Sequence, residues 1–127
     1  MILHKLRLFV LGHMGRNMSA KEIILSNVIN SGTSETFEFP KAIPANEIWT
    51  IKEFGAADIN MGDNISSIYV LRFGTDIIKI IALTGNTHEF ILNKSLKGDG
   101  LKKLNVYVSN KSGFSKQMPF WIKGFVN

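Results

Sequence analysis

Short runs in which apolar and polar residues alternate recur along the chain, and residues that favour turns separate them. The clearest run follows a Gly-Asp-Gly turn at residues 98–100. We expect a hairpin corner there, because glycine accepts the positive φ that tight turns require. Every second residue from Leu104 to Val108 is apolar, while Asn105, Tyr107 and Ser109 are polar or amphipathic. This period of two predicts a strand with one buried face and one outward face.

The same pattern predicts about eight strands and no helix. Between Lys21 and Asn30 the β-branched residues favour a strand over a helix. Further strands are expected over residues 36–39, 48–54, 68–73, 77–84, 87–92 and 117–125. Short strands with regularly spaced turn signals predict an all-β fold: a single-domain, two-sheet β-sandwich with jelly-roll or Greek-key connections.

Residues 68–73 and 77–84 form the clearest strand pair, joined by the turn at residues 74–76. Both segments are apolar on both faces. A strand of this kind either occupies a central position in a sheet or has its outer face covered by another subunit. The sequence leaves both interpretations open.

The closing segment separates two sets of side chains. One face carries Met118, Phe120 and Ile122. The other face carries Trp121, Lys123 and Phe125. If the first set is core, the second set and Tyr107 look outward. Such aromatic residues can form a sugar-stacking platform or a protein interface, unless a loop or the N-terminal segment covers them.

Charge is concentrated at the N-terminus. The formal net charge is +5, and removing Lys5, Arg7 and Arg16 with residues 1–17 lowers it to +2. We interpret residues 1–17 as a basic, apolar arm or strand and residues 18–127 as the β-sandwich domain. Nucleic acid is not expected as a partner, because no basic cluster with interleaved aromatic residues follows. The most apolar run, residues 77–83, is far shorter than the ~20 residues of a membrane span.

No constellation of catalytic residues is recognisable. The absence of cysteine excludes disulfides, thiolate metal sites and cysteine nucleophiles. The three histidines are scattered, and no nucleophile elbow or phosphate loop is present. The loop from Asp58 to Asn64 collects oxygen ligands but lacks the terminal Glu and flanking helices of an EF-hand, so cation binding there stays open. We expect no enzyme activity, no catalytic residue, no metal and no cofactor.

One resemblance follows from the layout of these motifs. They are an I-W-T-I strand at residues 48–51, the apolar strand pair, G-D-G-x-K-K-L-x-V-x-V-S-N at residues 98–110, and W-I-K-G-F at residues 121–125. This layout resembles small jelly-roll or sandwich domains among the virion accessory proteins of tailed bacteriophages, such as head decoration proteins and fibre or tail modules. The resemblance implies a homo-oligomer that contacts a capsid or tail neighbour through a terminal arm, or a host-surface glycan through one face. It also implies location in the virion and assembly in the host cytoplasm.

We therefore expect a non-enzymatic structural subunit of a bacteriophage virion that acts through oligomeric assembly. The alternative is a carbohydrate-binding module in which Trp121 and Tyr107 stack on sugar rings. A cupin-type enzyme is the least favoured reading, because the histidines lie on separate segments. The candidate interface residues are Leu3, Lys5, Arg7, Phe9, Arg16, Tyr107, Trp121, Lys123 and Phe125. Deleting residues 1–17 should leave a folded domain and abolish assembly. The partner, the oligomer number and whether the arm packs on its own chain stay open.

Overall fold

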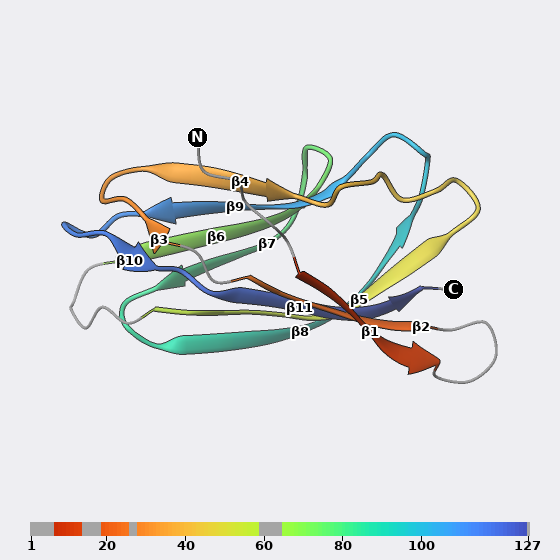
Figure 1. The fold of residues 1–127 in the computed structure, drawn as a ribbon, viewed down its shortest axis with the longest axis horizontal. Coiled ribbons are helices and arrows are strands. Elements are labelled where there is room, and N and C mark those ends of the chain that lie inside the picture. Colours follow the sequence, from red (N-terminus) through yellow and green to blue (C-terminus); the bar gives the residue numbers. More distant parts are fainter. Residues whose placement is uncertain (1–6, 14–18, 26–27, 59–64, 127) are drawn as a thin grey trace.

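The structure, a computed structural model, describes residues 7–13, 19–25, 28–58 and 65–126, with side chains from residue 28 onward. Every regular element in these ranges is a β-strand (Figure 1). The strands are β1 (Arg7–His13), β2 (Ser19–Leu25), β3 (Val28–Ile29), β4 (Ser34–Glu38), β5 (Ile48–Ala57), β6 (Ser67–Phe73), β7 (Asp76–Leu83), β8 (Thr87–Lys97), β9 (Leu104–Asn110), β10 (Lys116–Gln117) and β11 (Phe120–Val126). The described part of the chain contains no helix that could cross a membrane.

Two antiparallel sheets form the layers of a sandwich. The five-stranded sheet has the order β1-β2-β11-β5-β8, the four-stranded sheet has the order β4-β9-β6-β7, and β10 and β3 form a small two-stranded sheet. The pairs β2–β11, β4–β9, β5–β8 and β6–β7 are nested in sequence, as in one long hairpin that is folded over on itself. This nested pairing is the jelly-roll arrangement. The predicted all-β sandwich is therefore confirmed, with jelly-roll connections.

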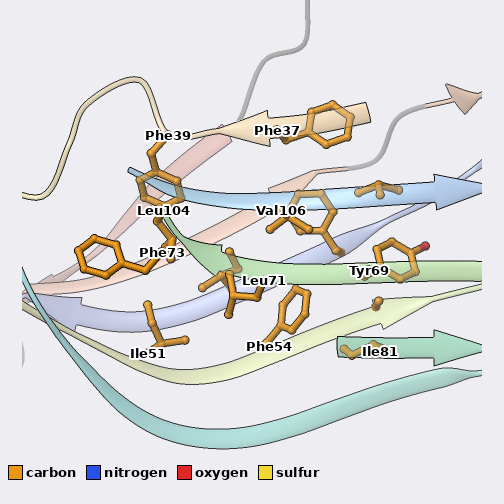
Figure 2. Close-up of a cluster of buried hydrophobic side chains, with 14 of the residues drawn as sticks. Phe37, Phe39, Ile51, Phe54, Tyr69, Leu71, Phe73, Ile81, Leu104 and Val106 are labelled. Carbon is orange, nitrogen blue, oxygen red and sulfur yellow. The ribbon is translucent and has the colours of Figure 1, made fainter. Parts of the chain in front are cut away.

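The core lies between the two sheets and is filled by one face of each (Figure 2). On β9 the apolar residues Leu104, Val106 and Val108 are buried, as the alternation predicts, but Asn105 and Ser109 on the predicted outward face are buried as well. Met118, Phe120 and Ile122 are also buried, which confirms their predicted place in the core. The ring of Phe120 lies 5.9 Å from that of Phe37, so an aromatic contact joins the closing strand to the opposite sheet.

The Gly-Asp-Gly turn makes a corner between the sheets, and its interpretation as a hairpin corner was wrong. Asp99 Oδ1 accepts hydrogen bonds from the backbone N–H groups of Leu101 and Lys102, both at 2.8 Å, and Gly100 has a φ of 76°. β8, which precedes the turn, belongs to the five-stranded sheet, whereas β9 belongs to the four-stranded sheet. Turn chemistry sets the local direction of the chain and does not decide which strands pair.

The two strands that are apolar on both faces have different positions. β6 lies between β9 and β7, so the predicted central position is correct for this strand. β7 pairs with β6 and lies at the edge of the described sheet, so a central position was the wrong reading for β7. The outer face of an apolar edge strand needs another explanation.

Candidate interaction surface

The outer face of the four-stranded sheet is apolar at one side. The strand registers place Ile68 beside Ala82, Val70 beside Ile80, and Arg72 beside Ile77. We define the β6–β7 face as these five apolar residues: Ile68, Val70, Ile77, Ile80 and Ala82. Ile77 is 61% exposed and Ile80 is 53% exposed. The face thus presents isoleucine side chains to solvent next to the sheet edge.

The other side of the same face, over β4 and β9, is polar, and its side chains form hydrogen bonds with neighbouring protein groups. Arg72 Nε donates to Asn105 Oδ1 at 2.9 Å, and its guanidinium carbon lies 5.5 Å from the ring centre of Tyr107. Asn105 Nδ2 donates to the carbonyl oxygen of Gly74 at 3.0 Å. Hydrogen bonding with Ser34, and then with Ser109, lowers the pKa of the Tyr107 phenol from its ordinary value. A polar area with a tyrosine and an arginine therefore borders the apolar β6–β7 face.

The neighbouring sheet edges carry features that oppose strand addition. Lys79 of β7 places its Nζ 4.2 Å from the ring centre of Phe90 on β8, and His88 stacks on the same ring at 5.9 Å. The β6–β7 register also shifts between Leu71 and Arg72. An edge lysine and an irregular register are features that discourage edge-to-edge pairing of sheets. The outer face of β6 and β7 is therefore a better candidate for a contact than the edge.

Trp121, Lys123 and Phe125 do share the outer face of β11, but β5 residues contact all three. The indole of Trp121 lies against Gly55. Lys123 pairs with Glu53 at 3.4 Å, and Lys52 Nζ lies 5.6 Å from the ring centre of Phe125. All three candidate side chains are half-buried. They form a covered surface on the five-stranded sheet.

Tyr107 and Trp121 are not brought together. Tyr107 belongs to β9 of the four-stranded sheet and Trp121 to β11 of the five-stranded sheet, and each faces away from the core between those sheets. They therefore lie on opposite outer faces of the sandwich. The expectation of one sugar-stacking platform that contains both rings was wrong, since alternation shows only that a residue faces away from its own sheet.

The N-terminal candidates are described only in part. Leu3, Lys5 and Arg16 lie outside the described residues. Arg7 and Phe9 belong to β1, where their backbone partners are Ile24 and Glu22 of β2. The described part of the arm, β1, is thus one of the five strands of the larger sheet and pairs within its own chain.

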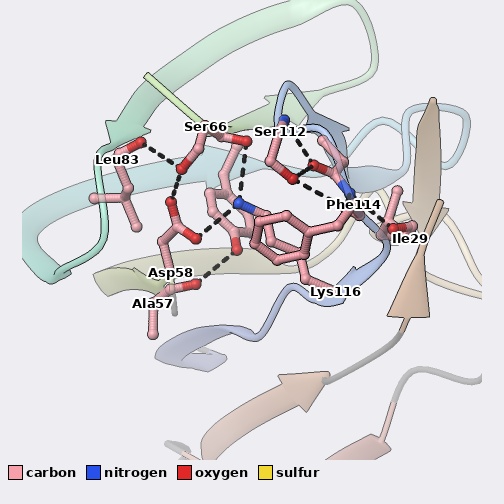
Figure 3. Close-up of polar contacts among 10 residues, drawn as sticks. Ile29, Ala57, Asp58, Ser66, Leu83, Ser112, Phe114 and Lys116 are labelled. Atoms are coloured by element: carbon pink, nitrogen blue, oxygen red, sulfur yellow. Dashed lines mark hydrogen bonds and ion pairs between the residues drawn. The ribbon is translucent and has the colours of Figure 1, made fainter. Parts of the chain in front are cut away.

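A buried polar cluster at one end of the sandwich gave no signal in the sequence (Figure 3). Lys116 Nζ lies 2.8 Å from Asp58 Oδ1, and both side chains are fully buried. The hydroxyl of Ser66 donates to Asp58 Oδ2, and Lys116 Nζ donates to the carbonyl oxygen of Ser66 at 3.2 Å. Asp58 belongs to the suspected cation loop, but the cation that it contacts here is the lysine ammonium. The other oxygen ligands expected in that loop, in residues 59–64, lie outside the described residues.

The surroundings of this cluster have a low polarity. Tyr69 is fully buried and donates from its hydroxyl to the carbonyl oxygen of Ala57 at 2.8 Å. Burial, and then the negative charge of Asp58, raises the pKa of the Tyr69 phenol above its ordinary value. The cluster combines residues 58 and 66 with residue 116, which is 50 or more positions away in sequence. A local motif search could not find it.

No protein-family model and no curated protein sequence matches the chain. Among solved structures, the chain is similar to one described as "Structure of infectious bursal disease virus Gx strain", at 14% identity and a TM-score of 0.41. A second match, "Structure of infectious bursal disease virus Gt strain", has 13% identity and the same TM-score. Each match covers 87% of this chain and 31% of the viral chain, so the protein spans about a third of their length.

Proposed function

We propose that the protein is a non-enzymatic structural subunit of a bacteriophage virion, a decoration or tail-associated protein, and that it acts by assembly. The observation that carries this proposal is the β6–β7 face, on which Ile77 and Ile80 are exposed at the edge of a sheet. The jelly-roll topology supports it at the level of fold class, because viral capsid domains use this architecture. Lectins and cupins use it too, so the fold alone does not assign a function.

The β6–β7 face has the composition expected of an interface. Interfaces place apolar side chains at the centre and polar ones at the rim, and they are enriched in tyrosine and arginine. Here Val70 lies beside Tyr107, and Ile77 lies beside Arg72. Full burial of each large apolar side chain would contribute about 1.5–3 kcal/mol. Covering this face therefore gives association a favourable free energy.

The N-terminal arm supplies a second contact in this proposal. Lys5, Arg7 and Arg16 carry most of the excess positive charge. Complementary charges steer association and fix orientation more than they add affinity. In the proposed mechanism the apolar face supplies free energy, and the arm directs the subunit to an acidic neighbour in the capsid or tail.

Two measurements test the proposal with the full chain. Light scattering over a range of protein concentrations should show oligomers that grow with concentration. The tagged protein should also sediment with assembled phage particles and be absent from the soluble fraction of infected host cytoplasm once particles are complete. A chain that is monomeric at every concentration and stays apart from particles contradicts the proposal.

Carbohydrate binding is not proposed as a second function. That alternative depended on Tyr107 and Trp121 acting on one sugar chain, and their places on opposite outer faces prevent it.

A further inference from the structure

Three backbone hydrogen bonds hold the segments that carry the buried Asp58–Lys116 pair, which Figure 3 shows. The backbone N–H of Asp58 donates to the carbonyl oxygen of Asn86 at 2.9 Å, and that of Ser66 donates to the carbonyl oxygen of Leu83 at 2.9 Å. The backbone N–H of Lys111 donates to the carbonyl oxygen of Ser66 at 2.8 Å. These bonds fix the end of β5, the start of β6 and the segment before β10, so the two charged side chains meet in one geometry.

Burial of this ion pair carries an unfavourable free energy of desolvation. Removing two ions from water carries a desolvation penalty that their mutual attraction repays only in part. In water the hydration of the two ions opposes their condensation to an amide. A site that excludes water removes this stabilisation of the reactants, and it also keeps the released water at low activity.

The amino group of Lys116 and the carboxyl group of Asp58 are in direct contact. Lys116 Nζ lies 2.8 Å from Asp58 Oδ1, one of the two oxygens bonded to the carboxyl carbon. Held groups of this kind reach effective concentrations of about 10⁵–10⁸ M relative to free reactants. The Ser66 hydroxyl donates to the other carboxyl oxygen, Oδ2, so the oxygen that must leave already has a proton donor.

We propose that Asp58 and Lys116 form an intramolecular isopeptide bond. A proton passes from the ammonium to the carboxylate, and the Nζ lone pair then attacks Cγ of the carboxylic acid. Two of the three ammonium protons end on the departing Oδ2 oxygen, to which the Ser66 hydroxyl donates a hydrogen bond, and the third stays on the amide nitrogen. The C–O bond breaks, one water leaves, and the product is a neutral amide between Cγ and Nζ. Both charges disappear, and no oxidant or further reactant is needed.

The bond joins the end of β5 to β10 and closes a covalent loop around β6, β7, β8 and β9. It would cross-link the sandwich in a protein that has no cysteine for a disulfide. This inference does not depend on the proposed virion function.

The test is the intact mass of the denatured full-length protein. The proposal predicts a mass one water below that of the sequence, and fragmentation that yields one branched peptide linking Asp58 to Lys116. The Asp58→Asn variant should reach the same product by losing one ammonia, and Lys116→Arg should keep its full sequence mass. Lys123→Met, which removes a half-buried ion pair on the five-stranded sheet, should still lose the water. A wild-type chain with its full sequence mass overturns the proposal, as does a water loss that persists in Lys116→Arg or maps to another residue.

Discussion

The indole ring of Trp121 lies against the backbone of Gly55, its cross-strand partner on the outer face of the five-stranded sheet. A Cβ atom at Gly55 would overlap the indole, so only glycine lets the ring lie across β5 in this position. The tryptophan is consequently half-buried and covers its own sheet. Its outward direction was predictable, but the glycine that receives it is a partner from another strand.

Gly55→Ala should therefore lower the free energy of unfolding by about 1–3 kcal/mol, the usual range for overpacking. Urea denaturation of both proteins measures the difference. Gly113→Ala is the matched control, because a Cβ there has nothing within 4 Å and its change should stay within about 0.5 kcal/mol. Equal stabilities for the two variants would show that the Trp121 contact is not tight.

Lys116→Met should be far more harmful than the same change at a half-exposed lysine. It removes the ammonium group that lies 2.8 Å from the buried Asp58 carboxylate, and loss of one partner of a buried ion pair typically costs about 3–5 kcal/mol. Lys123→Met also removes an ion pair, but the Lys123 side chain is 44% exposed, so the loss should be at most about 1 kcal/mol. Thermal or urea unfolding compares them. Similar small losses in both variants would contradict the assignment of Asp58 and Lys116 as a fully buried pair.

The two tyrosines should titrate separately. The pKa of Tyr107 is lowered by hydrogen bonding with Ser34, so its phenol should ionise below the ordinary value of 10.0. The pKa of Tyr69 is raised by burial, so it should stay neutral in the folded protein. Above pH 10 the unfolded chain releases the Tyr69 proton and the folded chain retains it. Stability should therefore fall as pH rises through this range.

Ultraviolet absorbance of phenolate measures both steps. Tyr107→Phe should remove the early step and leave only the ionisation that accompanies alkaline unfolding. Tyr69→Phe should keep the early step and weaken the fall in stability above pH 10. A single step with the amplitude of two tyrosines, near the ordinary pKa, contradicts the different environments of the two rings.

Removal of residues 1–17 tests the N-terminal arm. Among the described strands β1 pairs with β2, whereas the nested jelly-roll pairs begin with β2 and β11. The truncated chain should thus keep a β-rich circular dichroism spectrum and a cooperative unfolding transition, while its association with particles is lost. A truncated chain that does not fold would show that the arm is part of the domain.

Several features of the fold could be predicted because they depend on neighbours in sequence. Alternation placed Leu104 and Val106 in the core, and turn residues located the corner at residues 98–100. Apolar residues on both faces of β6 and β7 predicted a central position in the sheet or a covered outer face. Period and turn chemistry act over a few residues, so they determine strands and faces.

Relations between distant segments could not be predicted in this way. Nothing local assigns Tyr107 and Trp121 to different sheets, because both simply alternate with core residues. The sequence pattern indicates Asp58 as a possible cation ligand and gives no signal for Lys116. Their ion pair exists only because the jelly-roll brings the end of β5 next to β10.

The central claim is that the β6–β7 face mediates assembly, and Ile80→Lys tests it most directly. Ile91→Lys is the matched control, because Ile91 is 76% exposed on the edge strand of the other sheet, with Glu53 as its cross-strand partner. Both variants should fold, since each residue is exposed. Sedimentation velocity should show oligomers for the wild type and Ile91→Lys, and monomers for Ile80→Lys. If Ile80→Lys assembles like the wild type, or both variants dissociate to the same extent, the β6–β7 face is not the interface.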